Sequence, residues 1–410
     1  MTKEKVIPQI RFSGFTDTWE QRKLSAIADK VTEKNVGLQY IETFTNSAEF
    51  GIISQRDFFD HDIAKMSSLG GYYIVRSEDF VYNPRISTSA PVGPINRNKL
   101  GRIGVMSPLY TVFRPHDIDT TYLEYFFKSK YWHSFMNFNG DSGARSDRFS
   151  IKDSVFFEMP IPIPHIDEQK KIGEYLAYLD RLITLHQRKY DKLTKVKKAM
   201  LEKMFPENGS PYPEIRFKGF TDAWEQRKLG EVVKEVTRND STSEAPIMMI
   251  TANNGFIEQS ERYAFNNAGE SLKKYILLEK GELAYNHGAS KLRPYGSCFA
   301  LTTAENARIP FVYHCFSVEN QNAEFMSIEL NSSEIENQLR KIVSSGARMD
   351  GLLNISFDEY SSVSVVLPSI EEQDRIAGFL RNLDRLITLH QRKLEKLKNI
   401  KKACLEKMFV

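Results

Sequence analysis

The decapeptide DRLITLHQRK occupies residues 180–189 and returns unchanged at residues 384–393. A second stretch, RFSGFTDTWEQRKL at residues 11–24, returns as RFKGFTDAWEQRKL at residues 216–229. The two repeats are offset by 204 and 205 positions, so two copies of one unit fill almost all of the 410 residues. Repetition on this scale predicts a duplicated scaffold.

The interiors of the two copies have diverged. Residues 36–140 and 241–343 agree only at scattered positions, although the sequences that frame them match closely. A repeated frame with two different interiors predicts one protein that recognises two different targets at a fixed separation. A hydrophobic content of 41% and a charged content of 27% are typical of folded globular domains, and two domains fit this length.

The cysteines and histidines show no ligand pattern. Cys298, Cys315 and Cys404 are widely spaced and odd in number, which indicates reduced structural thiols and not a disulfide framework or a zinc site. The eight histidines include no H-E-x-x-H spacing, so no metal site is expected. No apolar run is long enough to span a bilayer and the start lacks a signal peptide, so we expect no membrane association and a cytoplasmic location.

The positive charge is unevenly distributed. Residues 167–206 and 371–410 each contain ten Lys or Arg and six Asp or Glu, so these segments carry +8 and the rest of the chain carries −5. Net charge alone therefore does not mark the globular parts as nucleic-acid binders. The Lys-rich ends of the two segments fit a solvated face that matches the helix dipole, or else a docking surface or a contact with the DNA backbone.

The same two segments predict long helices. Apolar residues recur at alternating steps of four and three, the seam of a coiled coil. The first seam comprises Ile172, Leu176, Leu179, Ile183, Tyr190, Leu193, Met200 and Met204, and the second comprises Ile376, Leu380, Leu383, Ile387, Leu394, Leu397, Cys404 and Met408. Ser369 and Glu372 predict a capping box at the start of the second helix, and His165 takes the cap position in the first.

Connectivity predicts that the helices are antiparallel. The ten-residue linker PENGSPYPEI at 206–215 reaches at most about 35 Å, so the second globular part should lie near the end of the first helix, with one globular domain at each end of the pair. Pairing Ile183 with His390 and His186 with Ile387 places a pseudo-twofold axis in the identical decapeptide. We expect His186 and His390 to fix the helix register; a metal or catalytic role for them lacks supporting ligands.

Each globular part is predicted to be mixed α/β, that is α+β, with short strands. Two extended stretches flank a turn in YYIVRSEDFVYNP at 72–84 and in KYILLEKGELAYNH at 274–287, and both end on Tyr-Asn. The segments VFFEMPIPIP at 155–164 and YSSVSVVLPS at 360–369 read as extended and lead into the helices. SGAR turns precede them in both copies.

With these residues in view, the chain resembles the specificity subunit of type I restriction–modification systems over its whole length. The resemblance is carried by the F-x-G-F-T-D-x-W-E-Q-R-K-L openings, the YNPR…GVMSPLYTVF run at 82–113, the SGAR turns, and the P-x-I-x-E-Q starts of both helices. It implies two target recognition domains joined by an antiparallel pair of long coiled-coil helices. The domains would be a first target recognition domain (1–164), a first spacer helix (165–205), a linker (206–215), a second target recognition domain (216–368) and a second spacer helix (369–410).

In that family each domain reads one half of a split DNA sequence. The resemblance implies that the partners are double-stranded DNA with a split target, two methyltransferase (M) subunits and two restriction (R) subunits. It also implies no catalysis and no cofactor in this chain, because S-adenosylmethionine, ATP and Mg²⁺ belong to the partner subunits. The sequence agrees: it contains no N-P-P-[FYW], G-x-G-x-x-G or G-x-x-x-x-G-K-[ST] motif.

Base readout is expected among divergent polar residues near the Tyr-Asn turns, which themselves read as structural. The candidates are Arg85, Ser87, Arg97, Asn98, Lys99 and Arg148 in the first copy and His287, Ser290, Lys291 and Arg293 in the second. Arg145 and Arg348 belong to the repeated SGAR turns. Because shared residues cannot make two domains read different sequences, these two are assigned to phosphate contact or fold support.

Two other classes of function fit the same pattern. One is a two-headed coiled-coil scaffold that binds proteins and not DNA. The other is an enzyme whose active site lies in the divergent interiors. Sequence-specific, salt-sensitive binding to a split DNA site would exclude the first, and the absence of turnover by the chain alone would exclude the second.

Overall fold

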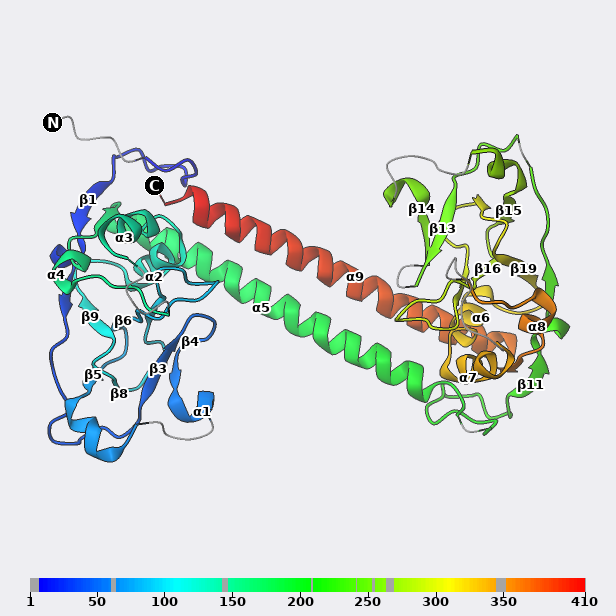
Figure 1. The fold of residues 1–410 in the computed structure, drawn as a ribbon, viewed down its shortest axis with the longest axis horizontal. Helices are drawn as coiled ribbons and strands as arrows, with labels where there is room; N and C mark the ends of the chain where they lie inside the picture. The colour runs from blue at the N-terminus through cyan, green and yellow to red at the C-terminus, as the bar shows by residue number, and fades with distance from the viewer. Residues whose placement is uncertain are drawn as a thin grey trace. The chain divides into compact units, whose positions relative to one another are not determined.

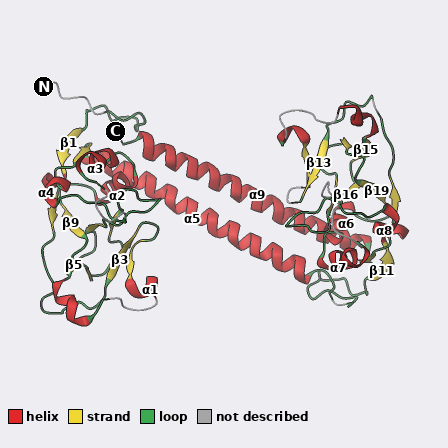
Figure 2. Ribbon diagram, in the orientation of Figure 1, coloured by secondary structure: helices red, strands yellow, loops and turns green. Residues whose placement is uncertain are grey.

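The chain forms two compact units. The structure, a computed structural model, describes residues 7–59, 64–141, 147–207, 209–240, 242–252, 255–262, 269–343 and 352–409. Unit 1 consists of Met1–Arg188 with His390–Val410, and unit 2 is Lys189–Leu389. Each unit therefore contains one globular part and a portion of both long helices, so the boundaries between units fall within the helices and not at the helix starts. Helices and short strands mix in both units, as the sequence predicts (Figure 2).

The central element of unit 1 is an antiparallel sheet of four strands in the order β2-β9-β6-β7. These strands are β2 (Ala28–Lys30), β9 (Thr111–Pro115), β6 (Phe80–Tyr82) and β7 (Ile95–Arg97). Unit 1 also has three two-stranded pairs, β1 (Glu20–Lys23) with β10 (Pro160–Ile163), β3 (Phe44–Ser47) with β4 (Gly51–Ser54), and β5 (Tyr73–Val75) with β8 (Gly104–Met106). Its short helices are α1 (Gln55–Phe59), α2 (Thr120–Lys128), α3 (His133–Asn139) and α4 (Asp153–Phe156).

Unit 2 repeats this plan. Its four-stranded sheet has the order β12-β19-β16-β17, with β12 (Val233–Glu235), β19 (His314–Val318), β16 (Leu283–Asn286) and β17 (Ser297–Ala300). The two-stranded pairs are β11 (Glu225–Lys228) with β20 (Ser364–Leu367), β13 (Met248–Thr251) with β14 (Gly255–Glu258), and β15 (Ile276–Glu279) with β18 (Asn306–Ile309). Its short helices are α6 (Ala323–Glu329), α7 (Ser333–Ile342) and α8 (Phe357–Ser361) (Figure 1).

The repeated EQRK segments form the first strand of each unit. Glu20 lies opposite Ile163 in unit 1, and Glu225 lies opposite Leu367 in unit 2. The two ends of each globular part are therefore joined by the same antiparallel pair. The segments at 155–164 and 360–369 are not extended throughout, because α4 and α8 end within them before the strands begin.

The two long helices are α5 (Ile166–Lys203) and α9 (Ile370–Lys407), with 38 residues each. They agree with the predicted spans to within three residues. The expected capping box of α9 is only half formed: the Ser369 hydroxyl accepts from the Glu372 backbone N–H at 3.4 Å, but the Glu372 carboxylate binds elsewhere. It accepts two hydrogen bonds from the Arg216 guanidinium, at 2.7 and 2.8 Å.

The E-Q dipeptide that begins each long helix connects the helix to its own globular part. In unit 1 Glu168 accepts two hydrogen bonds from Arg11, as Glu372 does from Arg216 in unit 2. The next residue, Gln169, accepts a hydrogen bond from the Asp119 backbone N–H. It donates one to the carbonyl of Pro164, the residue that follows β10. Bidentate arginine–carboxylate pairs are strong and directional, so the repeated motifs fix the angle at which the helix leaves the domain.

Each long helix ends in the core of the other copy's unit. Phe409, at the end of α9, packs against Tyr122 and Phe126 in unit 1. Phe205, at the end of α5, packs against Trp224 and Phe325 in unit 2. Within each unit the two helix portions therefore run antiparallel, which is the predicted pairing.

Buried apolar side chains explain this arrangement. In unit 1 the seam residues Ile172, Leu176 and Leu179 lie in one cluster with Cys404 and Met408. The three cysteines are buried and free, in agreement with structural thiols. No helix among the described residues is both long and apolar enough to cross a membrane.

Candidate nucleic-acid interface

The repeated Tyr-Asn turn is held by the same contacts in both units. The Tyr82 hydroxyl donates to the Val92 carbonyl at 3.0 Å, and the Tyr285 hydroxyl donates to the Tyr295 carbonyl at 2.6 Å. The turn closes on a glycine with positive φ, Gly93 in unit 1 and Gly296 in unit 2, where a Cβ would meet a backbone oxygen at 2.2 and 2.6 Å. These positions are related by an offset of 203 residues, and their role is structural.

In unit 1 this turn brings together three of the candidate residues. Arg85 and Arg148 are backbone partners in an antiparallel bridge, and Ser87 lies two residues further along an exposed turn. The Arg85 guanidinium is 71% exposed, and its nearest ion-pair partner is Asp147, with Nη2 and Oδ2 3.6 Å apart. An exposed ion pair at this distance is weak, so the guanidinium is available to a ligand.

A hollow of about 480 Å³ lies beside these residues. Arg148 contributes to its wall together with the aromatic side chains of Tyr73, Tyr82, Tyr110 and Phe149. Arginine and aromatic rings in one concave surface suit the edges and faces of nucleic-acid bases. Sequence reasoning missed this feature; the signal was Tyr110, which lies in the GVMSPLYTVF run but was not singled out.

One side of the hollow in unit 1 is polar. Lys30 forms an ion pair with Asp153, and the hydrogen bond to that carboxylate raises the pKa of Lys30. The Thr111 hydroxyl donates to the same carboxylate at 3.2 Å. In unit 2 the corresponding strand position holds His314, which packs against Phe357, a residue at the place of Asp153. The two units therefore present different chemistry at matched positions.

The structure places Arg97 and Asn98 in the interior, which argues against base readout by either. The Arg97 guanidinium is 9% exposed and lies 2.6 Å from the carboxylate of Glu124, which is 6% exposed. Burial disfavours the charge of Glu124, but Lys128, Arg97 and Lys99 together offset that cost and lower its pKa. Asn98 is fully buried and donates to two backbone carbonyls. Lys99 keeps an exposed ammonium group 3.2 Å from Glu124.

In unit 2 the candidate readout residues also divide into a buried residue and exposed ones. His287 is buried, and its Nδ1 and Nε2 lie 2.8 and 2.7 Å from the carbonyl oxygens of Leu353 and Val312, so the ring connects three segments of the fold. Burial, together with neighbouring His287, lowers the pKa of His314. We therefore remove His287 from the readout candidates because a ligand cannot reach its nitrogens.

The exposed candidates of unit 2 lie on the turn that follows His287. Ser290 and Lys291 are exposed, whereas the Arg293 guanidinium donates to the Asn331 carbonyl at 2.8 Å. The Ser290 hydroxyl accepts from the Arg293 backbone N–H and shapes the turn. Arg145 and Arg348 lie outside the described residues.

The two central histidines meet each other directly. His186 Nδ1 and His390 Nδ1 are 2.8 Å apart and the ring centroids 5.0 Å apart, so each histidine contacts the residue at its own position in the other copy. A polar contact on an otherwise apolar seam agrees with the prediction that these histidines act on the helix register. The described residues contain no cluster of three or more His, Cys, Asp or Glu side chains that could hold a metal ion.

Comparison with known proteins agrees with this architecture. The family model of the type I restriction modification DNA specificity domain matches twice, at residues 17–195 and 221–399. The chain is 25% identical over 329 residues to the type I restriction enzyme MjaVIII specificity subunit of Methanocaldococcus jannaschii, covering 74% of this chain and 73% of that protein. It is also 25% identical over 313 residues to the MjaIX specificity subunit of the same organism, covering 70% and 67%.

A solved structure has the same fold. The type I restriction–modification system S subunit from M. genitalium aligns with a TM-score of 0.56 and 13% identity, covering 98% of this chain and 99% of that one. Two copies of a specificity domain on paired long helices define a DNA specificity protein that is not itself an enzyme. The chain belongs to the type I restriction–modification DNA specificity family.

Proposed function

We propose that this chain reads a bipartite DNA target, with unit 1 on one half-site and unit 2 on the other. The supporting observation is that both units keep the same turn, closed by Gly93 and Gly296, but differ in the side chains around it. Arg85, Ser87 and Arg148 with the aromatic hollow would read bases in unit 1. Ser290 and Lys291 would do so in unit 2.

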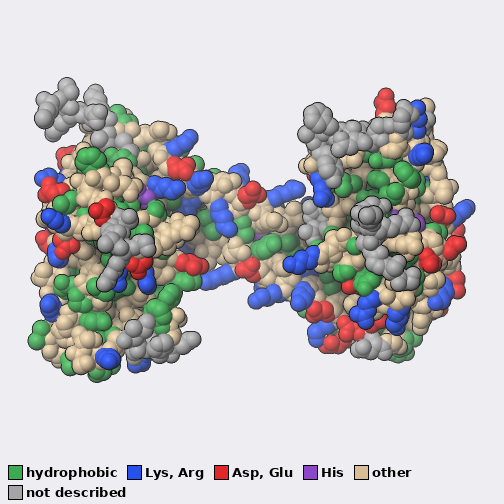
Figure 3. Space-filling model, in the orientation of Figure 1, with side chains coloured by type: hydrophobic (Ala, Val, Ile, Leu, Met, Phe, Trp, Pro, Cys, Tyr) green, Lys and Arg blue, Asp and Glu red, His purple; other side chains and the backbone are tan. Residues whose placement is uncertain are grey.

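The partners would be two methyltransferase and two restriction subunits in the cytoplasm. These would supply S-adenosylmethionine, ATP and Mg²⁺ chemistry. Support for two identical partners comes from the repeated decapeptide, because Leu185 and Leu389 occupy the same position of the two copies and are 46% and 44% exposed. Identical apolar side chains on two exposed helix surfaces suit two copies of one protein. On the face shown in Figure 3, Lys and Arg side chains gather over the long helices.

DNA readout is tested by a gel-shift titration of the chain with its methyltransferase partner and S-adenosylmethionine. The DNA panel carries single-base variants of both half-sites. We expect Arg85→Ala and Arg148→Ala each to cost about 1–3 kcal/mol against the cognate DNA and to relax preference within one half-site. Arg22→Ala is the matched control, because Arg22 is an exposed arginine of unit 1 on β1. A loss spread evenly over both half-sites would contradict one domain per half-site.

Methyltransferase binding is tested separately by the mass of the purified complex. We expect Leu185→Ser combined with Leu389→Ser to release methyltransferase without lowering the thermal midpoint of the chain, since both leucines are already exposed. Lys192→Ser combined with Lys396→Ser is the matched control at two exposed helix positions. Full methyltransferase binding by the double leucine variant would refute this surface.

A further inference from the structure

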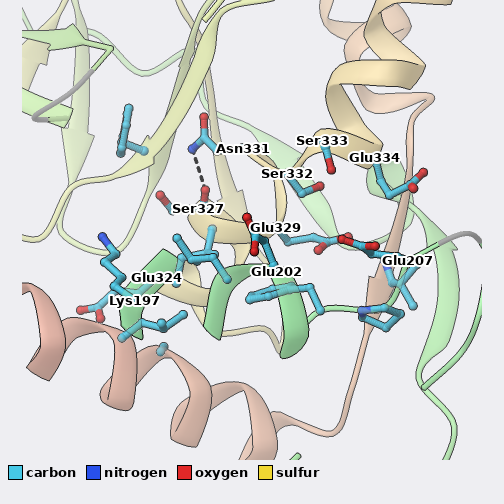
Figure 4. A pocket seen from close by; sticks show the side chains of 18 of the residues that line it. Lys197, Glu202, Glu207, Glu324, Ser327, Glu329, Asn331, Ser332, Ser333 and Glu334 are labelled. Carbon is cyan, nitrogen blue, oxygen red and sulfur yellow. Dashed lines mark hydrogen bonds between the residues drawn. The ribbon is translucent and has the colours of Figure 1, made fainter. Parts of the chain in front are cut away.

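Unit 2 contains a cavity of about 650 Å³ bounded by the end of α5, by α6 and α7, and by β17, β20 and α9. Figure 4 shows that its labelled polar side chains come from several elements and gather around Glu329. The apolar part of the wall includes Phe205, Ile328 and Leu380. Arg293, on the turn that carries Ser290 and Lys291, lies at the wall of the cavity, where its guanidinium donates to the Asn331 carbonyl at 2.8 Å. Contact between the exposed Ser290 and Lys291 and DNA does not account for the buried part of the cavity.

The corresponding positions in unit 1 hold larger side chains. Asp119 caps α2 and Asn322 caps α6, each with a side-chain oxygen that accepts from a backbone N–H. These two residues are 203 positions apart, as are the matched residues of the Tyr-Asn turns, so residues between the turns and these helices are matched by the same offset. In unit 1 the matched positions hold three cations, one carboxylate and one aromatic ring. These residues are Arg97, Lys99, Lys128, Glu124 and Phe126. In unit 2 they hold Ala300, Thr302, Asn331, Ser327 and Glu329, and all five line the cavity.

The exchange removes the three cations at the matched positions and places a buried acid, Glu329, among them. Glu329 is 5% exposed, and its Oε1 accepts from the Val366 backbone N–H at 3.2 Å. No Lys or Arg among the described residues forms an ion pair with it, and burial raises its pKa to about 7, an effect that Glu334 increases. Its second oxygen, Oε2, has no hydrogen bond from any residue that the structure describes. A buried carboxylate without a cation is costly unless a ligand supplies one.

The neighbouring charges do not fill this need. Lys197 pairs with Asp384 at 2.6 Å, and Arg381 pairs with Glu324 at 2.8 Å. These cations are already neutralised at the edge of the cavity. Lys198 lies 3.8 Å from Glu202, and the Arg293 guanidinium donates to the Asn331 carbonyl. The wall also contains hydroxyl and amide groups and apolar side chains, which are typical of sites for small organic ligands.

We propose that this cavity binds a small organic cation, with an amidinium, guanidinium or ammonium group on Glu329 and an aromatic or alkyl body against Phe205 and Ile328. Unit 1 supports this chemistry, because there the protein's own Arg97 guanidinium and Phe126 ring occupy the matched positions. A planar cation can donate two hydrogen bonds to one carboxylate, which gives both strength and orientation. The ligand replaces the groups that the second copy has lost.

The proposal is tested by isothermal titration calorimetry of the full chain at pH 8 with benzamidine, which joins an aromatic ring to an amidinium. We expect a dissociation constant of about 0.1–1 mM. Benzamide, the neutral analogue of the same shape, should bind at least about tenfold more weakly because it lacks the charge. Equal binding of the two compounds, or no binding of benzamidine at concentrations well above this range, would overturn the proposal.

Two variants locate the site. Glu329→Gln should weaken benzamidine binding by about tenfold to a hundredfold, because the amidinium loses a hydrogen bond to a charged acceptor. Ala300→Arg restores the residue of unit 1, so its guanidinium should occupy the carboxylate and abolish binding while the chain stays folded. Glu334→Gln, an exposed position on the rim, is the control and should change affinity little. Unchanged affinity in both Glu329→Gln and Ala300→Arg would show that benzamidine binds elsewhere.

Discussion

Replacing Glu329 should change how the stability of the chain depends on pH. Burial raises the pKa of this carboxyl from 4.5 to about 7 in the folded protein. Below about pH 4.5 both folded and unfolded states carry the proton, so ionisation has no effect on stability. Between about pH 4.5 and pH 7 the unfolded state releases the proton while the folded state keeps it, so the stability of the fold falls as the pH rises. Above pH 7 the full cost is present, about 3 kcal/mol at 1.36 kcal/mol per pKa unit.

Glu329→Gln keeps the shape and the acceptor for Val366 but cannot ionise. We expect the difference in unfolding free energy, variant minus wild type, to increase in favour of the variant by about 2.5 kcal/mol between pH 5 and pH 8. The measurement is urea unfolding of both chains without added amines, at closely spaced pH values. Other groups titrate equally in both chains, so the difference isolates residue 329. Parallel stability curves over this range would refute the buried, uncompensated carboxylate.

Glu124→Gln in unit 1 is the control, because the pKa of Glu124 is lowered whereas that of Glu329 is raised. Lys128, Arg97 and Lys99 more than offset the burial of Glu124, so its pKa is lowered and its ionised form stabilises the fold at neutral pH. The variant should lose stability at pH 7, and the loss should shrink as the pH falls toward the range where the wild-type carboxylate takes up its proton. A gain in stability at pH 7 would contradict the ionic cluster.

Other features give further predictions. His186→Leu combined with His390→Leu should stabilise the chain and leave its DNA target unchanged, as measured by unfolding and by gel shift, because an apolar pair replaces a polar contact on the seam. Glu168→Gln should cost about 3–5 kcal/mol in urea unfolding, because a mostly buried guanidinium loses its ionised partner. Arg145→Ala or Arg348→Ala should weaken binding to all DNA sequences and reduce the salt slope by about one counterion if the arginine contacts a phosphate. A sequence-selective loss would instead favour base readout.

The duplicated architecture was predictable because repeats are visible without any knowledge of packing. The frame motifs recur in order, and the spans of α5 and α9 follow from apolar periodicity. The capping box of α9 illustrates the limit of local patterns. Glu372 has the right spacing to reach back to the helix start, but a guanidinium from Arg216, 156 residues away, binds its carboxylate instead.

The candidate site was only partly predictable for the same reason. Arg85, Ser87 and Arg148 come together on one surface, as their proximity to the Tyr-Asn turn and SGAR segment suggested. Asn98 and His287 are equally polar in sequence, yet both are buried and bind backbone carbonyls. Polarity does not reveal burial when the partners are main-chain groups from distant segments, because any sequence provides those groups.

The two copies also show which positions the fold holds fixed. Tyr82 and Tyr285 are identical, and each donates to a backbone carbonyl, a partner that no substitution can remove. Arg97 binds another side chain, that of Glu124, and in the second copy both members have changed, to Ala300 and Ser327.

The difference has a physical cause. Losing one member of a buried ion pair leaves an unpaired charge at a cost of about 3–5 kcal/mol, whereas losing both leaves none. Divergence in such a pair therefore proceeds through replacement of both residues, and it leaves a cavity where the larger side chains were. The repeated frame keeps both members of such a pair, as in Arg11–Glu168 and Arg216–Glu372, and it also keeps the side-chain bonds to the backbone. The surfaces and the cavity beside them are free to differ between the copies.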